Sequence, residues 1–382
     1  MSQTPAISVV IPVYNMAAYV GQCLDSVLTQ NFTNFELIVV NDGSTDNSLD
    51  IINTYAQRDK RIHLINKPNG GMACAYNTGQ QVARGKYLCF LDSDDWMGPD
   101  YLKTMYTIAE REQVDVVKTF AFISEQNGKH WEKRMIPFEK CNKVFTNMLE
   151  IPEFVSGHVA QWSCLYRHEF LLKNNIWCPE FPKKLNPDID YMYHVWAKCK
   201  SLYIVPKAFI HYRMDNMNSY KYAGAKMSFY LLQAHLVTRG TMANLVLPKP
   251  YWQVKAQVEY QHLLYEFETH RCCEHRLAFI RGLSKIFREN LKHNLVNLKT
   301  FPPNHARRYR FIAKAPELYW LNDTLRFWSV SKTLFTNVIT LWRFFGLYKC
   351  VIDKKEQRIY LFGCLIKKST LKDKHEEIDS TR

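Results

Sequence analysis

Three carboxylates crowd into four consecutive residues, Asp92-Ser93-Asp94-Asp95, directly after the apolar run 87–91. Charges this close repel one another beside an apolar segment, so a positive group is expected to meet them. Hard divalent cations such as Mg²⁺ and Mn²⁺ prefer carboxylate oxygens and often share their site with substrate phosphates. The cluster therefore predicts a Mn²⁺ or Mg²⁺ site. The alternative is a solvated acidic loop that caps the following helix.

Three further polar clusters follow one another in the first hundred residues. Pro12-Val13-Tyr14-Asn15 ends the first apolar run, Asn41-Asp42-Gly43-Ser44 ends the second, and Asn69-Gly70-Gly71 leads into a helical pattern. Aromatic, amide and carboxylate groups in such loops can stack on a small ligand and hydrogen-bond to it. With the acidic cluster they mark four points at which chemistry is expected.

The elements that must position these clusters alternate between strand and helix. Strands are predicted over 6–13, 35–40, 62–65 and 87–91, and helices over 15–30, 44–56 and 71–83, with Ser44 or Thr45 as the N-cap of the second helix. Strands separated by helices of this length predict a parallel α/β sheet. Ligands of such sheets bind beyond the carboxyl ends of the strands, where the four clusters fall.

Beyond residue 100 the pattern changes from α/β to mostly α-helical. A helix is expected over 101–112, a strand over 114–122, a polar loop over 129–143, long helices over 223–245, 251–270 and 276–295, and a hairpin over 357–368. We therefore divide the chain into an α/β domain, 1–220, and a helical C-terminal region, 221–369, which includes a basic aromatic segment and the hairpin. The charged tail, 370–382, is expected to be disordered.

Several segments carry a resemblance to a known family. They are SVVIPVYNMAAYVGQCLDSVLTQNFTNFELIVVNDGSTDNS, NGGMACAYNTG and GKYLCFLDSDDWMGPDYL, followed by WSCLYRHEFL, PDIDYMYHVW and IHYRMDNMNS. Residues 1–220 resemble the catalytic domain of family 2 glycosyltransferases. The resemblance implies a GT-A, Rossmann-like nucleotide-sugar-binding domain, with a donor-binding half over about 6–105 and an acceptor and base half over about 106–220. The closing RIYLFGCLIKK is similar to tails of bacterial lipopolysaccharide and capsule glycosyltransferases.

The resemblance implies a role for each polar cluster. Tyr14 would stack on the nucleotide base, and Asp42 would accept a hydrogen bond from a base N–H; strand-end packing and an ordinary turn are the alternatives. Asp94 corresponds to the metal ligand, and Asp92 to a carboxylate near the metal, ribose and diphosphate. Asp95 would support them or contact the donor sugar. Family habit favours UDP. The remaining nucleotide-sugar contacts would be Pro12, Asn15, Ser44, Asn69, Gly70 and Ser93.

A general base must take the proton of the acceptor hydroxyl. In the family a Glu-Asp pair opens a helix, and the matching segment here is Asn186-Pro187-Asp188-Ile189-Asp190. Asp188 occupies the base position, and Pro187 replaces the Glu. The helix dipole favours the ionised form of Asp188, so burial must raise its proton affinity if it is the base. The alternatives are that Asp188 only caps the helix, or that Asp190 is the base.

Three residues of the second half are assigned by the same resemblance. His211 stands near the position of a third metal ligand, although a lone His in a strand also packs or lies at the surface. Arg213 can hold a diphosphate bidentately. Trp162 lines the sugar or acceptor site, or belongs to the core. The segment ACAYN, residues 73–77, lacks the Arg that commonly precedes the Asn in this family.

The resemblance and these residues predict an inverting glycosyltransferase, either a hexosyl- or an N-acetylhexosaminyltransferase. The expected acceptor is a saccharide or lipid-linked saccharide in lipopolysaccharide, lipooligosaccharide or capsule biosynthesis. One alternative is a non-catalytic nucleotide-sugar-binding or assembly protein, which Pro187 supports. Another is a basic nucleic-acid-binding protein, against which the acidic cluster argues. No nucleic-acid partner is therefore expected.

Positive charge is concentrated near the end of the chain. Of the formal net charge of +14, residues 301–382 carry +8, from sixteen Lys and Arg against eight Asp and Glu. Aromatic residues interleave with these cations, and an apolar stripe recurs at helical spacing: Leu334, Val338, Leu341, Phe345 and Tyr348. Such a helix can lie among the headgroups of an anionic membrane, so 305–355 is the predicted membrane-binding segment. Packing of the stripe on the catalytic domain is the alternative.

Composition is typical of a globular protein with two or three domains. Hydrophobic residues make up 47% and charged residues 23% of the 382 residues, which excludes general disorder. No signal peptide is expected, and no run of 18 apolar residues occurs. Eleven cysteines without a CxxC pair indicate reduced thiols. We therefore expect a cytoplasmic protein that binds peripherally to the cytosolic face of the inner membrane.

Overall fold

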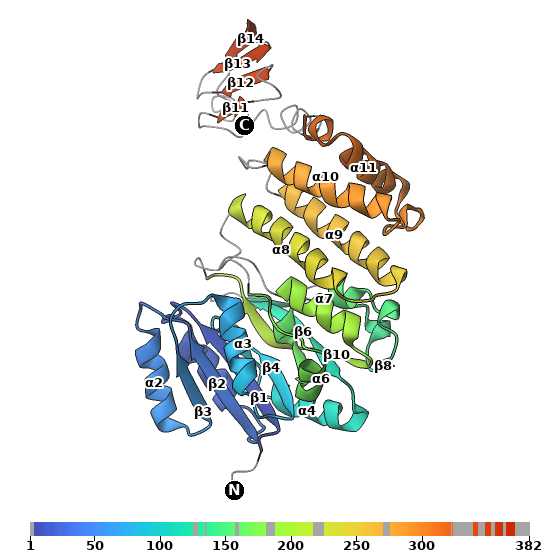
Figure 1. Cartoon of the computed structure of the whole chain (residues 1–382). Coiled ribbons are helices and arrows are strands. Elements are labelled where there is room, and N and C mark those ends of the chain that lie inside the picture. Colours follow the sequence, from blue (N-terminus) through green and yellow to red (C-terminus); the bar gives the residue numbers. More distant parts are fainter. Residues whose placement is uncertain are drawn as a thin grey trace, which may run out of the picture.

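The computed structural model describes residues 4–124, 129–133, 136–156, 160–180, 188–216, 225–269, 276–321, 323, 339–342, 348–352, 356–361 and 364–370. They form an α/β part, a helical part and a small terminal sheet, from bottom to top in Figure 1. Within these residues, no helix is both long and apolar enough to cross a membrane. The seven cysteines whose side chains are described are free thiols.

Four parallel strands and three helices form the first half of the α/β part. They are β1 (Ile7–Val13), α1 (Val20–Leu28), β2 (Phe35–Asn41), α2 (Ser48–Arg58), β3 (Ile62–Asn66), α3 (Met72–Val82) and β4 (Tyr87–Phe90). The strands lie in the order β3-β2-β1-β4, and every neighbouring pair is parallel. This confirms the predicted parallel sheet. Every residue of β1, β2 and β4 is buried, as apolar strands covered on both faces require.

Two helices begin later than the sequence predicts. α1 begins at Val20, because Asn15 has a φ of +54°, outside the helical region. α2 begins at Ser48, so the predicted N-cap is wrong. Ser44 and Thr45 instead hydrogen-bond to Asn15 and thereby join two loops.

The second half of the α/β part completes the sheet with mixed strand directions. β9 pairs antiparallel with both β4 and β6, whereas β6 and β10 are parallel. The sheet order is β3-β2-β1-β4-β9-β6-β10-β5, with β7 beside β6 and β8 beside β10. The predicted polar loop 129–143 is wrong over β7, which pairs along the edge of β6. The elements are β5 (Trp96–Met97), α4 (Tyr101–Glu112), β6 (Val116–Ser124), β7 (His130–Lys133), η1 (Phe138–Lys140), β8 (Val144–Phe145), η2 (Met148–Glu150), α5 (Glu153–Ser156), η3 (Gln161–Ser163), β9 (Cys164–Arg167), α6 (His168–Lys173), α7 (Asp188–Lys198) and β10 (Leu202–Arg213).

The helical part consists of helices stacked one upon another beyond the sheet (Figure 1). The expected helices over 223–245, 251–270 and 276–295 are confirmed as α8 (Ala225–Ala243), α9 (Lys249–Thr269) and α10 (Arg276–Lys292), and α11 (Pro303–Lys314) follows η5 (Leu298–Thr300). The core of the α/β part extends into these helices through Ala234, Met242 and Val258. A second core around Tyr260 and Phe287 joins α8 to α11. The predicted boundary near residue 220 lies outside the described residues, and packing continues across it.

The terminal sheet contains β11 (Ile339–Trp342), β12 (Tyr348–Ile352), β13 (Glu356–Leu361) and β14 (Cys364–Thr370), each antiparallel to the next. The predicted hairpin over 357–368 is confirmed as β13 and β14. The predicted amphipathic helix across 334–348 is wrong over 339–342 and at Tyr348, which are strand. β-Branched and aromatic residues also suit a paired strand. The spacing of the apolar residues could not show that β11 pairs with β12. Residues 371–382 of the predicted tail lie outside the described residues.

A buried carboxylate joins β1, β2 and the end of α3. Glu36, 3% exposed, accepts hydrogen bonds from Ser8 Oγ at 2.6 Å and from the Arg84 backbone N–H and Nη2, each at 2.7 Å. Burial alone would raise the pKa of Glu36, but the hydrogen bonds from Ser8 and Arg84 outweigh burial, and the pKa lies below its usual value. The ionised carboxylate therefore stabilises the folded protein.

We expect Glu36→Gln to lower the free energy of unfolding by about 1–3 kcal/mol at pH 7, because charge-assisted hydrogen bonds are lost. The folded-state pKa is depressed, so the contribution is present above the unfolded pKa of about 4.3 and disappears as pH falls through the folded pKa. Urea unfolding of both proteins between pH 7 and pH 3 measures this. Glu169→Gln, at an exposed ion pair on α6, should change little. An equal loss in both variants would contradict the assignment.

Candidate functional site

The loops after β1 and β2 are held together by hydrogen bonds. The Asn15 backbone N–H donates to Ser44 Oγ at 3.0 Å, and Asn15 Oδ1 accepts from the Thr45 N–H at 2.7 Å. Tyr14 lies next to Asn15 and is 46% exposed, so part of its ring is open to a ligand. Pro12 is buried within β1, in register with Val40. The site can therefore use the side chain of Tyr14 more readily than that of Pro12.

Asp42 connects the loops after β2 and β3. Its carboxylate accepts hydrogen bonds from Lys67 Nζ at 2.7 Å and from the N–H groups of Gly70 and Gly71 at 2.8 and 2.7 Å. Asp42 is 2% exposed, and Lys67 neutralises its charge. The relative position of the two loops is thus fixed by protein contacts before any ligand binds.

Gly43 is required for this junction. Its φ is +71°, and a Cβ atom at this position would lie 2.8 Å from the backbone nitrogen of Asn69. Only glycine combines that conformation with so close an approach. The predicted contacts Asn69 and Gly70 are half-buried here, with Gly70 bound to Asp42.

The acidic turn, defined here as residues 92–95 between β4 and β5, carries more negative charge than its neighbours neutralise. Asp92 Oδ1 accepts from the buried Tyr76 hydroxyl, and Asp94 Oδ2 accepts from Asn216 Nδ2 at 2.8 Å. Both donors are neutral groups. Burial, followed by the charge of Asp94, raises the pKa of Asp92 to about 7.

Asp95 extends this charge imbalance into the protein interior. The carboxylate is 1% exposed; Oδ1 accepts from the Arg213 N–H at 2.8 Å, and Oδ2 has no hydrogen-bond partner among the described residues. Burial and the charges of Asp94 and Asp92 raise its pKa well above the usual value. Crowded carboxylates repel one another, and a divalent cation would offset their charge. Of the three, Asp92 and Asp94 are partly exposed and could reach such a cation.

One buried cation, Arg213 of β10, supports the acidic turn. Its Nε donates to the Asp94 carbonyl at 2.7 Å, its guanidinium binds Gln22, and it lies 4.7 Å from the centre of the Trp96 ring. The side chain is 2% exposed. The guanidinium therefore binds other protein groups, and it is not the open diphosphate contact that the sequence predicts.

His211 is held away from a metal-binding arrangement by aromatic stacking. Its ring lies between Trp96 and Phe122, with centroid distances of 4.9 and 4.7 Å. Across the described ranges, no three His, Cys, Asp or Glu side chains are grouped to hold a metal ion. The predicted trio of Asp92, Asp94 and His211 is therefore not assembled, because the imidazole is part of an aromatic stack.

Asp188 begins α7 and lies near the acidic turn, although the two are far apart in sequence. Burial, followed by the charge of Asp92, raises the pKa of Asp188 well above the usual 3.8. The buried Tyr76 lies within reach of both carboxylates, whose charges contribute to raising its pKa after burial. Burial thus supplies the gain in proton affinity that a base at a helix N-terminus needs. Pro187 lies outside the described residues.

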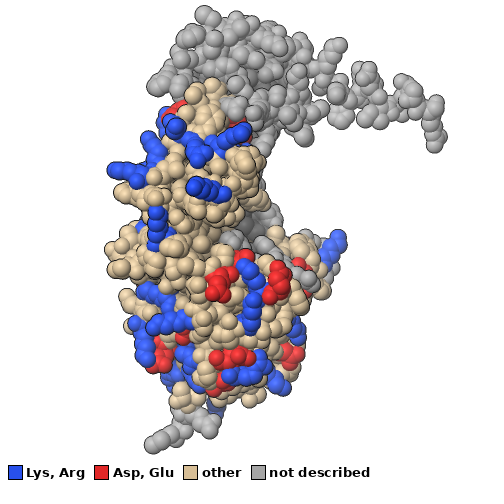
Figure 2. Space-filling view, turned by 90° about the vertical axis from the view of Figure 1, so that its right-hand side faces the viewer, with Lys and Arg blue, Asp and Glu red and all other residues tan. Residues whose placement is uncertain are grey.

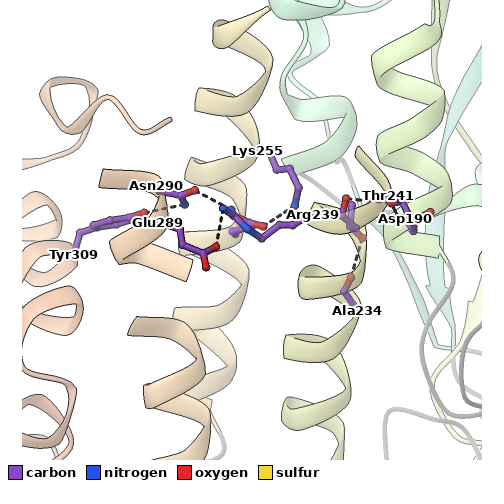
Figure 3. A network of polar contacts seen from close by, with 10 residues as sticks. Asp190, Ala234, Arg239, Thr241, Lys255, Glu289, Asn290 and Tyr309 are labelled. Carbon is purple, nitrogen blue, oxygen red and sulfur yellow. Dashed lines mark hydrogen bonds and ion pairs between the residues drawn. The ribbon is translucent and has the colours of Figure 1, made fainter. Parts of the chain in front are cut away.

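Asp190 and Trp162 occupy structural positions. Figure 3 shows the hydrogen bond that Asp190 Oδ1 accepts from the Thr241 hydroxyl of α8. Asp190 is 5% exposed. Residues two apart on a helix face different sides, so Asp190 is not placed to replace Asp188. Trp162 is 2% exposed and stacks on Tyr212 at 5.6 Å. It belongs to the core, which is one of the two alternatives that the sequence leaves open.

Three residues of the site were not predicted from the sequence. Tyr76 had a usable signal, because it stands where the family commonly has Arg before the Asn. Lys67 precedes the predicted Asn69 cluster and had a weaker signal. Asn216 follows β10 without any recognisable pattern, and only the fold brings its amide to Asp94.

Comparison with known proteins gives consistent matches. The family model described as Glycosyl transferase family 2 matches residues 8–173. YibD of Escherichia coli K12, named as an uncharacterized glycosyltransferase, is 35% identical over 185 residues, which are 46% of this chain and 52% of YibD. Hyaluronan synthase of Pasteurella multocida is 43% identical over 100 residues, which are 26% of this chain and 10% of the synthase. The crystal structure of S. aureus TarS 1–349 with UDP-GlcNAc covers 96% of this chain and 99% of that chain, with a TM-score of 0.66 and 19% identity.

Residues 8–173 are therefore a family 2 glycosyl transferase domain, and the chain has a GT-A fold with a helical C-terminal region. The predicted family and fold class are confirmed. The chain spans about half the length of YibD and a tenth of the length of hyaluronan synthase.

Proposed function

We propose that this protein is an inverting glycosyltransferase that moves a sugar from a nucleotide-sugar to a hydroxyl of a saccharide or lipid-linked saccharide. The observation that carries the proposal is the approach of Asp188 to the acidic turn at the carboxyl end of β4. A base with raised proton affinity, beside carboxylates that fit a divalent cation, suits attack on a sugar diphosphate.

The proposed donor site lies between the loops after β1, β2 and β3. The exposed ring of Tyr14 would stack on the base. The Asp42 carboxylate has about four acceptor positions, of which protein groups use three, so one is left for a base N–H. Asn15, Ser44, Asn69 and Ser93 would complete the site. UDP is the favoured nucleotide, and the UDP-GlcNAc bound by TarS belongs to this donor class.

In the proposed reaction, the acceptor oxygen bonds to the anomeric carbon while the bond from that carbon to the diphosphate breaks. Asp188 takes the hydroxyl proton, and the electron pair of the broken bond leaves with the nucleoside diphosphate. Attack from the face opposite the diphosphate inverts the anomeric centre. Asp92 and Asp94 would hold Mn²⁺ or Mg²⁺, which when bound offsets the charge of the leaving diphosphate.

The proposed setting is cell-surface polysaccharide synthesis, as lipopolysaccharide, lipooligosaccharide or capsule. Hyaluronan synthase, one of the relatives, is named as a polysaccharide synthase. The similarity of residues 358–368 to tails of lipopolysaccharide and capsule enzymes also supports this setting. A hexosyl- or N-acetylhexosaminyl transfer is expected. A non-catalytic nucleotide-sugar-binding protein is the alternative.

Asp188→Asn should lower kcat by roughly 10²–10⁴-fold, because it keeps the shape of the side chain and removes the proton acceptor. Donor binding, measured by calorimetry, should be unchanged. Asp50→Asn, also in the first turn of a helix, is the matched control and should keep full activity. If Asp190→Asn is crippling and Asp188→Asn is mild, the base is wrongly assigned. Donor binding by the wild type without any transfer or slow donor hydrolysis would support the non-catalytic alternative.

The pH dependence should follow from the raised pKa of Asp188. A base acts only when ionised, so kcat/KM should fall as pH is lowered, and the fall should begin above the range of an ordinary Asp, whose pKa is 3.8. Rates with the acceptor well below its KM over pH 4–9 measure this limb, which Asp188→Asn should remove.

Chelation should abolish transfer, and Mn²⁺ or Mg²⁺ should restore it, because Arg213 is a single cation beside the three carboxylates of the acidic turn. Asp94→Asn should weaken Mn²⁺ binding, measured by electron paramagnetic resonance, without lowering the melting temperature. Asp50→Asn again serves as control. Full activity of Asp94→Asn in the presence of chelator would rule out the metal site.

We also propose attachment to an anionic membrane on the cytosolic face, through the segment 305–355. Within this segment the structure describes most of α11, residues 315–321 and 323, β11 and β12. α11 packs beside α10, and Arg281 of α10 pairs with Glu317 beyond α11 at 2.9 Å, so the exposed cations of the two helices lie close together. Figure 2 shows Lys and Arg on the upper part of the coloured, described surface, where Asp and Glu are sparse. The exposed cations of the two helices are Arg281, Lys285, Arg288, Lys292, Arg307, Arg310 and Lys314.

Wild-type protein should float with vesicles that contain anionic lipid and not with neutral vesicles. Charge reversal of Arg307, Arg310 and Lys314 to Glu should lower partitioning by at least roughly a hundredfold, at about 1 kcal/mol for each lost cation. Reversal of Lys60, Lys103 and Lys200, exposed on the α/β part, gives the same net charge and is the control. Equal loss in both variants, or no flotation of the wild type, would contradict attachment through this segment.

A further inference from the structure

A buried polar network links the first turn of α7 to the helical part. Asp190 Oδ1 accepts from the Thr241 hydroxyl of α8 at 2.5 Å, whereas Asp190 Oδ2 is 3.7 Å from His194 Nε2, beyond hydrogen-bond distance. The Thr241 hydroxyl also lies 3.1 Å from the Thr238 carbonyl. A hydroxyl has one proton, and a carboxylate is the stronger acceptor, so Thr241 joins α8 to α7.

The position of α8 is itself fixed by Arg239, two residues before Thr241 in the same helix. Arg239 Nη1 binds Glu259 of α9 at 3.1 Å and Asn290 of α10 at 2.8 Å. Glu259 also accepts from Lys255 Nζ at 2.6 Å, and Asn290 Nδ2 donates to the Tyr309 hydroxyl of α11 at 3.0 Å. Figure 3 shows these contacts in one row, from Tyr309 through Arg239 to Thr241 and Asp190.

Burial gives this network its geometric precision. Glu259, Lys255 and Asn290 are at most 1% exposed. Charged groups without water must keep their partners, because an unpaired buried charge is far more costly than a paired one. The helices therefore have one favourable relative position. The hydrogen bond from Thr241 then fixes Asp190 relative to them.

Asp190 lies two residues after Asp188, in the same first turn of α7. Whatever fixes this turn also fixes the distance from Asp188 to the acidic turn. We propose that Thr241 is a positioning residue for Asp188, and that the helical part serves glycosyl transfer by holding the base in place. This inference rests on the proposed function, because it takes Asp188 as the base.

Thr241→Val removes the hydroxyl at nearly constant volume, and Thr241→Ser retains it. We expect Thr241→Val to lower kcat on the order of ten- to hundredfold, as small misplacements of a catalytic group do, with donor KM and donor binding unchanged. Thr241→Ser should restore most of the rate. Thr238→Val is the matched control, because its hydroxyl bonds to the Ala234 carbonyl within α8 and does not reach α7. It should leave kcat unchanged.

A double-mutant cycle tests whether Thr241 acts through Asp188. In the Asp188→Asn background, Thr241→Val should cause no further loss of kcat. Multiplied losses, equal losses for Thr238→Val and Thr241→Val, or no rescue by Thr241→Ser would overturn the proposal.

Hydrogen exchange separates this proposal from the proposed function. The amides of α7 should exchange faster in Thr241→Val than in wild type or Thr238→Val, whether or not the protein transfers sugar. If Asp188→Asn keeps full activity while α7 loses protection in Thr241→Val, the base assignment fails and the physical link remains. Unchanged protection of α7 would overturn the link itself.

Discussion

Negative charge at the end of β4 is the constraint on which the arrangement of the site depends. Asp92, Asp94 and Asp95 share one turn, and Arg213 is the buried cation that contacts it. Burial, followed by repulsion among the carboxylates that the single guanidinium does not balance, raises the pKa values of Asp92 and Asp95. This charge is the feature of the turn that suits the divalent cation proposed for it. The loops after β1, β2 and β3 are built around the same edge of the sheet.

The second consequence of this charge concerns Asp188. A carboxylate placed near Asp92 has a raised proton affinity because of burial and repulsion. That proton affinity suits a base, but burying an ionised carboxylate beside Asp92 destabilises the fold. Contacts at other residues must therefore hold α7 in place. Asp190, on the other side of the same turn, provides the anchor through Thr241. Two aspartates two residues apart therefore have different surroundings. Asp188 lies near the acidic turn, and Asp190 is bonded to α8.

The helical part is accordingly tied to the α/β part and not merely appended to it. Its first helices share the core of the sheet through Met242 and Val258. Its interior contains the ion pairs of Arg239 and Lys255 with Glu259. Its outer helices present cations with few acids among them. One helical stack thus combines a buried face that contacts α7 with an exposed face rich in Lys and Arg, the face proposed to bind an anionic membrane.

Sequence alone determined the first half of the fold, because local patterns are sufficient there. Alternating apolar strands and helices fix a parallel sheet, and the clusters at Tyr14, Asp42 and Asp92 must then share one edge. Sequence also gives Asp188 as the proposed base, through its resemblance to a family motif. Only the tertiary structure decided which polar side chains are exposed enough to contact a ligand. The sequence predicts Arg213 as a diphosphate contact and leaves Trp162 open between a ligand contact and the core, whereas in the fold both side chains are buried. His211 is held by aromatic stacking. Tyr76 and Thr241 owe their roles to partners 16 and 51 residues away, and no local pattern encodes such contacts.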